Sequence, residues 1–194
     1  MVISYSTWAD YAWKNELSTQ KNRVLQHLDE IINEAETDHN PHHMLERALG
    51  LAAFCMRRLI ECRLVTDRFR DAQLPVHTIP RLERDQRKGR EPYRDWTGGG
   101  LLETYDLNAR ISNPQKPSEV ANRILHARVI AIVSGSNHLS DGLLIASDRQ
   151  MDHSVYHFTR LEFDQLVEAF LSDRVVFEKD WVDAETGKTF AIRE

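Results

Sequence analysis

Apolar residues in the first half of the chain recur at three- and four-residue spacing, which is the period of an amphipathic helix. Between Trp8 and Glu36 the stripe comprises Trp13, Leu17, Val24, Leu28, Ile31 and Ala35. A second stripe runs from Leu45 to Phe69, and Asn40 followed by Pro41 is a favourable start for its helix. Because the connection TDHNPHH is short, the pattern predicts an N-terminal antiparallel helical hairpin.

The second half of the chain combines further helices with short apolar runs. We expect a short helix from Ser118 to about His126, followed by strands at RVIAIV, GLLIAS and SVYHF. Thr159 and Glu162 match a capping box that starts another helix, and residues 174–194 are expected to form a hairpin. Helices early and strands late favour an α+β fold with a small antiparallel sheet in the C-terminal half.

The segment 73–117 has no regular pattern. It contains five of the six prolines and the run Gly98–Gly100, which has neither the lysine nor the flanking strand and helix of a phosphate loop. A long irregular segment is usually functional, mobile or a misread element, and RLERDQRKGREPYR within it also suits a short exposed helix. We expect residues 1–194 to form a single domain that includes this segment.

Composition indicates a soluble protein. The 194 residues are 41% hydrophobic and 28% charged, and no run approaches the roughly 20 apolar residues of a membrane span. The first residues lack the pattern of a signal peptide. Cys55 and Cys62 would lie about 10.5 Å apart along one helix, too far for a disulfide, and both are expected to be buried thiols. The expected location is the cytoplasm, with no membrane partner.

Charge is unevenly distributed along the chain. The net charge is −5, but the stretch from Met44 to Arg94 contains twelve basic and seven acidic residues. A basic zone on an acidic protein can attract phosphate groups, as in RNA. The alternative is that these arginines form the solvated face of a helix and a loop.

Asn122, Arg123 and His126 are the residues most suggestive of chemistry. Asn122 and His126 are four residues apart and therefore share one face of the predicted short helix. A neutral imidazole can act as a general acid or base, and a neighbouring amide can fix its tautomer. The alternative is that His126 has a structural role where the helix ends and the strand begins.

The stretches ANRILHARVIAIV, GLLIASDR and SVYHFTRLEFDQLVEAF resemble a group of uncharacterised bacterial proteins. In that group a helix with an Asn-x-x-x-His pattern leads into a strand, then into a Ser-Asp-Arg turn, a short strand and a helix. AFCMRRLIECRLVTD matches the earlier part of the group. The resemblance covers the second helix and about residues 118–171 and implies a fold without an assigned function.

A more distant resemblance is to HEPN domains, helical modules that are often metal-independent ribonucleases in toxin and antiviral defence systems. Asn122 and His126 match the polar residue and the histidine of the HEPN motif. The resemblance implies that His126 transfers a proton at an RNA 2′-hydroxyl. Ala121 occupies the position of the motif's arginine, so Arg57 or Arg58 would supply the cation.

Glu61 lies within one turn of both Arg57 and Arg58 on the predicted second helix. These residues would complete the candidate catalytic group with Asn122 and His126. The alternative is a surface ion pair worth less than about 1 kcal/mol.

The histidines next to the first turn are candidate metal ligands. Asp38, His39, His42 and His43 are close in sequence, and His153 and His157 are four residues apart. Neither group has the ligand spacing of a zinc site, and histidines in turns are usually solvated. We therefore predict no metal and no cofactor.

No candidate catalytic set is complete in the sequence. The favoured function is a non-catalytic module that interacts with protein or nucleic acid, and the alternative is a HEPN-like ribonuclease. A homodimer that uses the wide apolar face of the second helix is a further hypothesis. Trp96 beside Tyr93 could stack on a base, but it is expected to hold the irregular segment against the core.

Overall fold

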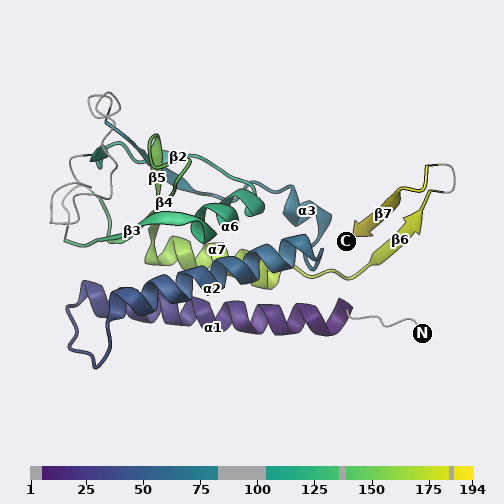
Figure 1. Cartoon of the computed structure of the whole chain (residues 1–194), viewed down its shortest axis with the longest axis horizontal. Helices are drawn as coiled ribbons and strands as arrows, with labels where there is room; N and C mark the ends of the chain where they lie inside the picture. The colour runs from purple at the N-terminus through teal and green to yellow at the C-terminus, as the bar shows by residue number, and fades with distance from the viewer. Residues whose placement is uncertain (1–5, 83–103, 136–138, 184–185) are drawn as a thin grey trace.

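Two long helices form the predicted hairpin. The computed structural model of the chain describes residues 6–82, 104–135, 139–183 and 186–194. Helix α1 (Ser6–Ile32) and helix α2 (Pro41–Glu61) lie side by side (Figure 1). The predicted cap is confirmed, because Oδ1 of Asn40 accepts hydrogen bonds from the backbone N–H groups of His42 and His43 at 3.0 and 3.3 Å.

Helix α2 ends earlier than the apolar pattern predicts. Its C-cap is Cys62, and Arg63 has a positive φ of 54° that interrupts the helix. A separate short helix, α3 (Asp67–Arg70), begins where the Thr66 side chain accepts a hydrogen bond from the backbone N–H of Phe69. The prediction of one continuous seam to Phe69 was therefore wrong, because a left-handed residue and a new cap lie within it.

The change of direction after α2 also separates the two cysteines. Cys55 is buried in α2, whereas Cys62 is exposed at its C-cap. The prediction that both thiols are buried is confirmed for Cys55 and wrong for Cys62. Both cysteines are free.

A five-stranded antiparallel sheet packs against the helices, with strand order β2-β1-β5-β4-β3. The three predicted strands are present as β3 (Ala127–Val133), β4 (Gly142–Ser147) and β5 (Ser154–Thr159). The other two, β1 (His77–Pro80) and β2 (Ile111–Ser112), come from the segment expected to be irregular. They are four and two residues long, too short to give a clear alternating pattern.

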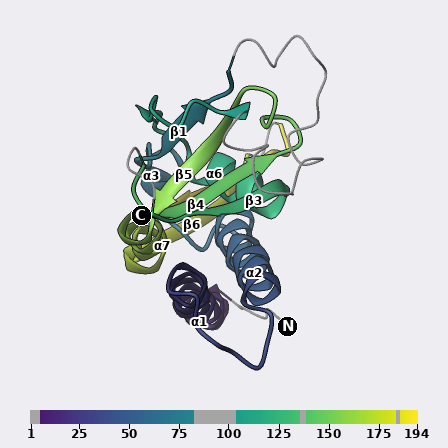
Figure 2. The same cartoon turned by 90° about the vertical axis from the view of Figure 1, so that its left-hand side faces the viewer.

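The central strands of the sheet, β4 and β5, are largely buried. Helices α1, α2, α6 (Pro117–Leu125) and α7 (Arg160–Ser172) lie on one side of the sheet (Figures 1 and 2). In β4, Leu143 and Ile145 pack into the core shared with the helices, whereas Leu144 and Ala146 pack into a second apolar cluster. This alternation follows the two-residue period of a strand, and all six residues of β4 are buried.

The start of α7 confirms the predicted capping box. The Thr159 side chain accepts from the backbone N–H of Glu162 at 3.2 Å, and the Glu162 carboxylate accepts from the backbone N–H of Thr159 at 2.9 Å. Reciprocal bonds of this kind satisfy two donors at the helix start. They also fix the direction in which the chain leaves β5.

The predicted C-terminal hairpin is also present. Strands β6 (Glu178–Val182) and β7 (Thr189–Arg193) form a separate two-stranded sheet, and Gly187 in its turn has a positive φ of 66°. The hairpin projects from the rest of the molecule (Figure 1). Trp181 and Phe190 are paired across it and their rings stack with centroids 5.4 Å apart.

Candidate functional site

Helix α6 presents polar side chains on the face opposite its packing surface. Val120, Ala121 and Ile124 are buried, whereas Asn122 and His126 are exposed. His126 is the C-cap residue of α6, and its backbone N–H donates to the carbonyl of Asn122 at 3.0 Å. The C-cap of α6 therefore uses only the backbone of His126, and its side chain remains accessible.

These exposed side chains line a pocket of about 480 Å³. Its walls come from Arg57 of α2, from α6, and from the turn that follows β4. Helix α6 contributes Glu119, Asn122, Arg123 and His126, and the turn contributes the whole of Ser147–Gln150. The pocket therefore joins three elements that are far apart in the sequence.

Arg123 is the most unusual residue of the pocket. It is 7% exposed, and its guanidinium lies over the ring of Tyr156 at 3.7 Å from the ring centroid. Its Nε donates a hydrogen bond to Oε1 of Gln150 at 2.5 Å, but Nη1 is buried and has no hydrogen-bond partner among the residues that the structure describes. A buried donor without a partner costs about 1–3 kcal/mol, and more when the group is charged.

Burial affects the ionisation of both groups in this stack. It lowers the pKa of Arg123 below its ordinary value and raises the pKa of Tyr156 to about 12. Arginine remains protonated at neutral pH. Arg123 therefore brings a positive charge to the lining of the pocket.

Two more arginines border the pocket, and two carboxylates oppose them. Arg57 pairs with Glu61 at 2.5 Å, and Arg149 is exposed. Asp148 pairs with Arg128 at 3.0 Å, and Glu119 is exposed. Surface pairs of this kind are weak, so Arg57 and Arg149 are accessible to a competing anion.

The structure brings together three of the five predicted site residues. Arg57, Asn122 and His126 line the same pocket. Arg58 instead lies over the Trp13 ring of α1, 5.5 Å from its centroid. Glu61 contacts Arg57 and is not part of the pocket lining.

The sequence singled out Arg123 but did not predict its burial, and it did not identify Arg149 or Gln150 as site residues. The Ser-Asp-Arg turn was recognised, but as a turn alone. The burial of Arg123 could not be read from the helical period, because an arginine on a short helix is usually exposed. Tyr93, Trp96, Gly98–Gly100 and most of the predicted exposed helix at 81–94 lie outside the described residues.

A second polar cluster lies at the start of α7, and its side chains bond to one another and to the backbone. The buried His157 accepts from Nε of Arg110 at 2.8 Å, and its Nε2 lies 2.9 Å from the carbonyl of Ser140. Arg110 also contacts Glu162 at 2.5 Å, and His77 lies 3.0 Å from Glu162. Burial and the Arg110 charge lower the pKa of His157 to about 4. This cluster joins β1, β5 and α7 and has a structural role.

The structure separates the histidines that were grouped by sequence. His39 turns toward α1, whereas His42 and His43 line a different hollow with Arg128. His153 is exposed and His157 is buried. In the described part of the chain, the side chains that converge as potential metal ligands are His27, Glu30 and His39.

Comparison with known proteins yields no relative: no family model, no curated protein and no solved structure matches the chain. Among the described helices, none is both long enough and apolar enough to cross a bilayer. The resemblances drawn from the sequence therefore stay predictions.

Proposed function

We propose that the chain is a non-catalytic nucleic-acid-interaction module that binds RNA phosphates in the α6 pocket. The observation that carries the proposal is the buried Arg123 with its unpartnered Nη1. A phosphate oxygen is the strongest partner for a guanidinium N–H, because the bond is charge-assisted. Arg57 and Arg149 would contact the same phosphate or its neighbour at the rim.

The size and polarity of the pocket support a phosphate-bearing ligand. Its lining consists of charged, amide, hydroxyl and imidazole side chains. Asn122 and His126 can bond to ribose or base groups beside a phosphate, as in recognition of single-stranded RNA. Arg57 belongs to the basic stretch recognised in the sequence.

RNA binding can be tested by fluorescence anisotropy with a labelled single-stranded RNA over a range of salt concentrations. We expect Arg123→Met and Arg149→Met each to weaken binding by about tenfold or more, since a charge-assisted bond is worth about 1.5–3 kcal/mol. Each should also reduce the slope of log affinity against log salt by about one. Met preserves much of the arginine volume, so the fold is retained.

Arg160→Met is the matched control, because it removes the same charge from an exposed arginine that pairs with Asp29 outside the α6 pocket. We expect it to change RNA affinity less than twofold. Equal weakening by Arg160→Met and Arg149→Met would contradict the proposal, as would binding that is independent of salt.

A HEPN-like ribonuclease is the second candidate function, favoured by the convergence of Arg57, Asn122 and His126 on one pocket. In this alternative, His126 moves the proton of a 2′-hydroxyl and Arg57 stabilises the developing phosphate charge. Turnover that His126→Ala abolishes without changing RNA affinity would replace the module proposal. The module proposal expects the wild type and His126→Ala to leave the RNA equally intact.

Most of the apolar surface of α2 that the homodimer hypothesis requires is covered within the chain. The apolar residues of α2 pack against α1 and α6, and the exposed Phe54 contacts the Trp13 ring at 5.6 Å between centroids. We retain the cytoplasm as the proposed location, which the two free cysteines support.

A further inference from the structure

Three potential metal ligands meet where α1 joins the connection to α2. His27 and Glu30 are three residues apart in the last turns of α1, so their side chains share one face. His39 belongs to the connection and folds back toward them. The ligand atoms of the three side chains all lie within 4.8 Å of one another.

One carboxylate oxygen is the centre of this group. Oε2 of Glu30 lies 2.7 Å from Nδ1 of His27 and 3.2 Å from Nε2 of His39. The two imidazole rings meet edge to face, with their centroids 5.3 Å apart. Both rings therefore direct a nitrogen toward the same point.

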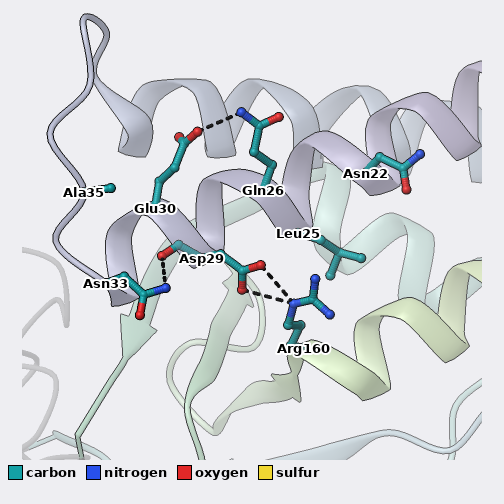
Figure 3. A pocket seen from close by; sticks show the side chains of 8 residues that line it. All are labelled: Asn22, Leu25, Gln26, Asp29, Glu30, Asn33, Ala35 and Arg160. Carbon is teal, nitrogen blue, oxygen red and sulfur yellow. Dashed lines mark hydrogen bonds and ion pairs between the residues drawn. The ribbon is translucent and has the colours of Figure 1, made fainter.

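Neighbouring groups hold the three side chains in place. Gln26 donates to Oε1 of Glu30 at 2.7 Å, as Figure 3 shows, which leaves Oε2 directed at the histidines. The Thr37 hydroxyl donates to the carbonyl of His39 at 2.7 Å and fixes the connection. His27 is 5% exposed. Hydrogen bonds of this kind orient the ligands of metal sites in proteins.

We propose that His27, Glu30 and His39 form a zinc-binding site. Two imidazoles and one carboxylate are a known ligand set for Zn²⁺, with the fourth position left for water. Water can reach that position, because the side chain of His39 is 39% exposed.

The same geometry has an explanation without metal, and the two differ in their protons. Without metal, each imidazole donates an N–H to the Glu30 carboxylate. With Zn²⁺, both nitrogens present lone pairs to the ion and the carboxylate binds it directly. Ligand atoms around tetrahedral zinc are about 3.3–3.5 Å apart, given bonds of about 2.0–2.1 Å. The distances of 2.7 and 3.2 Å from Oε2 of Glu30 to the two imidazole nitrogens would therefore lengthen toward this separation when Zn²⁺ binds.

The test is calorimetric titration of zinc chloride into the chelator-treated full chain, from which any histidine tag has been removed. We expect one Zn²⁺ per chain. Glu30→Gln and His39→Ala should each weaken binding by about 100-fold or more, since loss of a ligand exceeds the 10–100-fold cost of losing an outer partner. Cobalt chloride should give the visible absorption of a tetrahedral site in the wild type and not in either variant.

His42→Ala is the matched control, because His42 belongs to the same connection but lines another hollow. It should bind Zn²⁺ like the wild type. His39 and His42 are both exposed, so neither substitution endangers the fold. Absence of one-to-one binding would overturn the proposal, and so would equal affinities of the His39→Ala and His42→Ala variants. RNA affinity in the α6 pocket is measured separately and does not enter this test.

Discussion

Two buried polar residues differ in whether their hydrogen bonds are satisfied within the chain. Both ring nitrogens of His157 have partners, in Arg110 and Ser140. Arg123 is also buried, but its Nη1 has no hydrogen-bond partner among the described residues. Satisfied buried groups are usually structural, whereas an unsatisfied buried charged donor requires a separate explanation. This contrast separates the candidate site from the polar cluster at α7.

His157 makes stability depend on pH. Burial and Arg110 lower its pKa to about 4 in the folded chain, against an ordinary value of about 6.5. Between these values the unfolded chain binds a proton that the folded chain does not. The free energy of unfolding therefore falls as the pH drops from 6.5 to 4, by about 3 kcal/mol for this residue. Urea denaturation at several pH values measures the effect.

The groups that face His157 are Arg110, Glu162 and His77. His157→Gln should flatten the pH profile between 6.5 and 4, because glutamine does not titrate. His153→Gln, which changes an exposed histidine nearby, should leave the profile unchanged. A His157→Gln profile as steep as the wild type would show that other groups cause the dependence.

The positions where helices begin are set by side-chain caps more than by the extent of their apolar stripes. Asn40 starts α2, Thr66 starts α3 and Thr159 starts α7. Asp173, which follows α7, accepts hydrogen bonds from the backbone N–H and the hydroxyl of Thr66 at 2.7 and 2.8 Å. One carboxylate therefore joins the end of α7 to the start of α3.

Two glycines inside regular elements should respond in opposite ways to a methyl group. A Cβ at Gly142 of β4 would lie 2.2 Å from the backbone oxygen of Phe158, so Gly142→Ala must separate β4 from β5. We expect a loss of about 3 kcal/mol. A Cβ at Gly50 of α2 would meet nothing within 4 Å, and Gly50→Ala should stabilise by about 0.5–1 kcal/mol.

Chemical denaturation of both glycine variants against the wild type measures these changes. Because the chemical change is the same, the pair separates close packing from helix propensity. Destabilisation by Gly50→Ala would show that the surroundings of α2 are described wrongly. A stability unchanged by Gly142→Ala would show that the β4–β5 contact is described wrongly.

At the scale of the whole molecule, the C-terminal hairpin is loosely joined to the rest. Its links include the bond from Nη1 of Arg63 to the carbonyl of Ala191 at 3.3 Å and the bond from the backbone N–H of Arg193 to Asp67 at 2.9 Å. Several apolar side chains of the hairpin and of the two residues before it are exposed, namely Val176, Phe177, Trp181, Val182 and Phe190. A two-stranded hairpin of this kind contributes little to the main core.

Removal of residues 176–194 should therefore leave the rest of the chain folded. We expect the free energy of unfolding to fall by less than about 2 kcal/mol, because few bonds are lost. Asp173→Ala in the full chain, which breaks the link to Thr66, should cost a similar amount or more. Circular dichroism during denaturation measures both, and an unfolded truncated chain would contradict this description.

The sequence by itself determined the long local elements. The stripes of α1 and α2, the Asn40 cap, the apolar runs of β3 to β5 and the capping box of α7 depend on neighbouring residues alone. These elements were predicted for that reason. The sequence also placed Asn122 and His126 on one face of α6, because residues i and i+4 are neighbours in the helical repeat.

The tertiary structure alone decided what distant segments form together. Strands β1 and β2 are too short to show a period. They form because β5 offers its edge to β1 and β1 in turn pairs with β2. Arg123 is buried because Tyr156 and Gln150 lie against it, and His27 meets His39 because the connection folds back on α1. Such contacts depend on packing between segments, which no local pattern records.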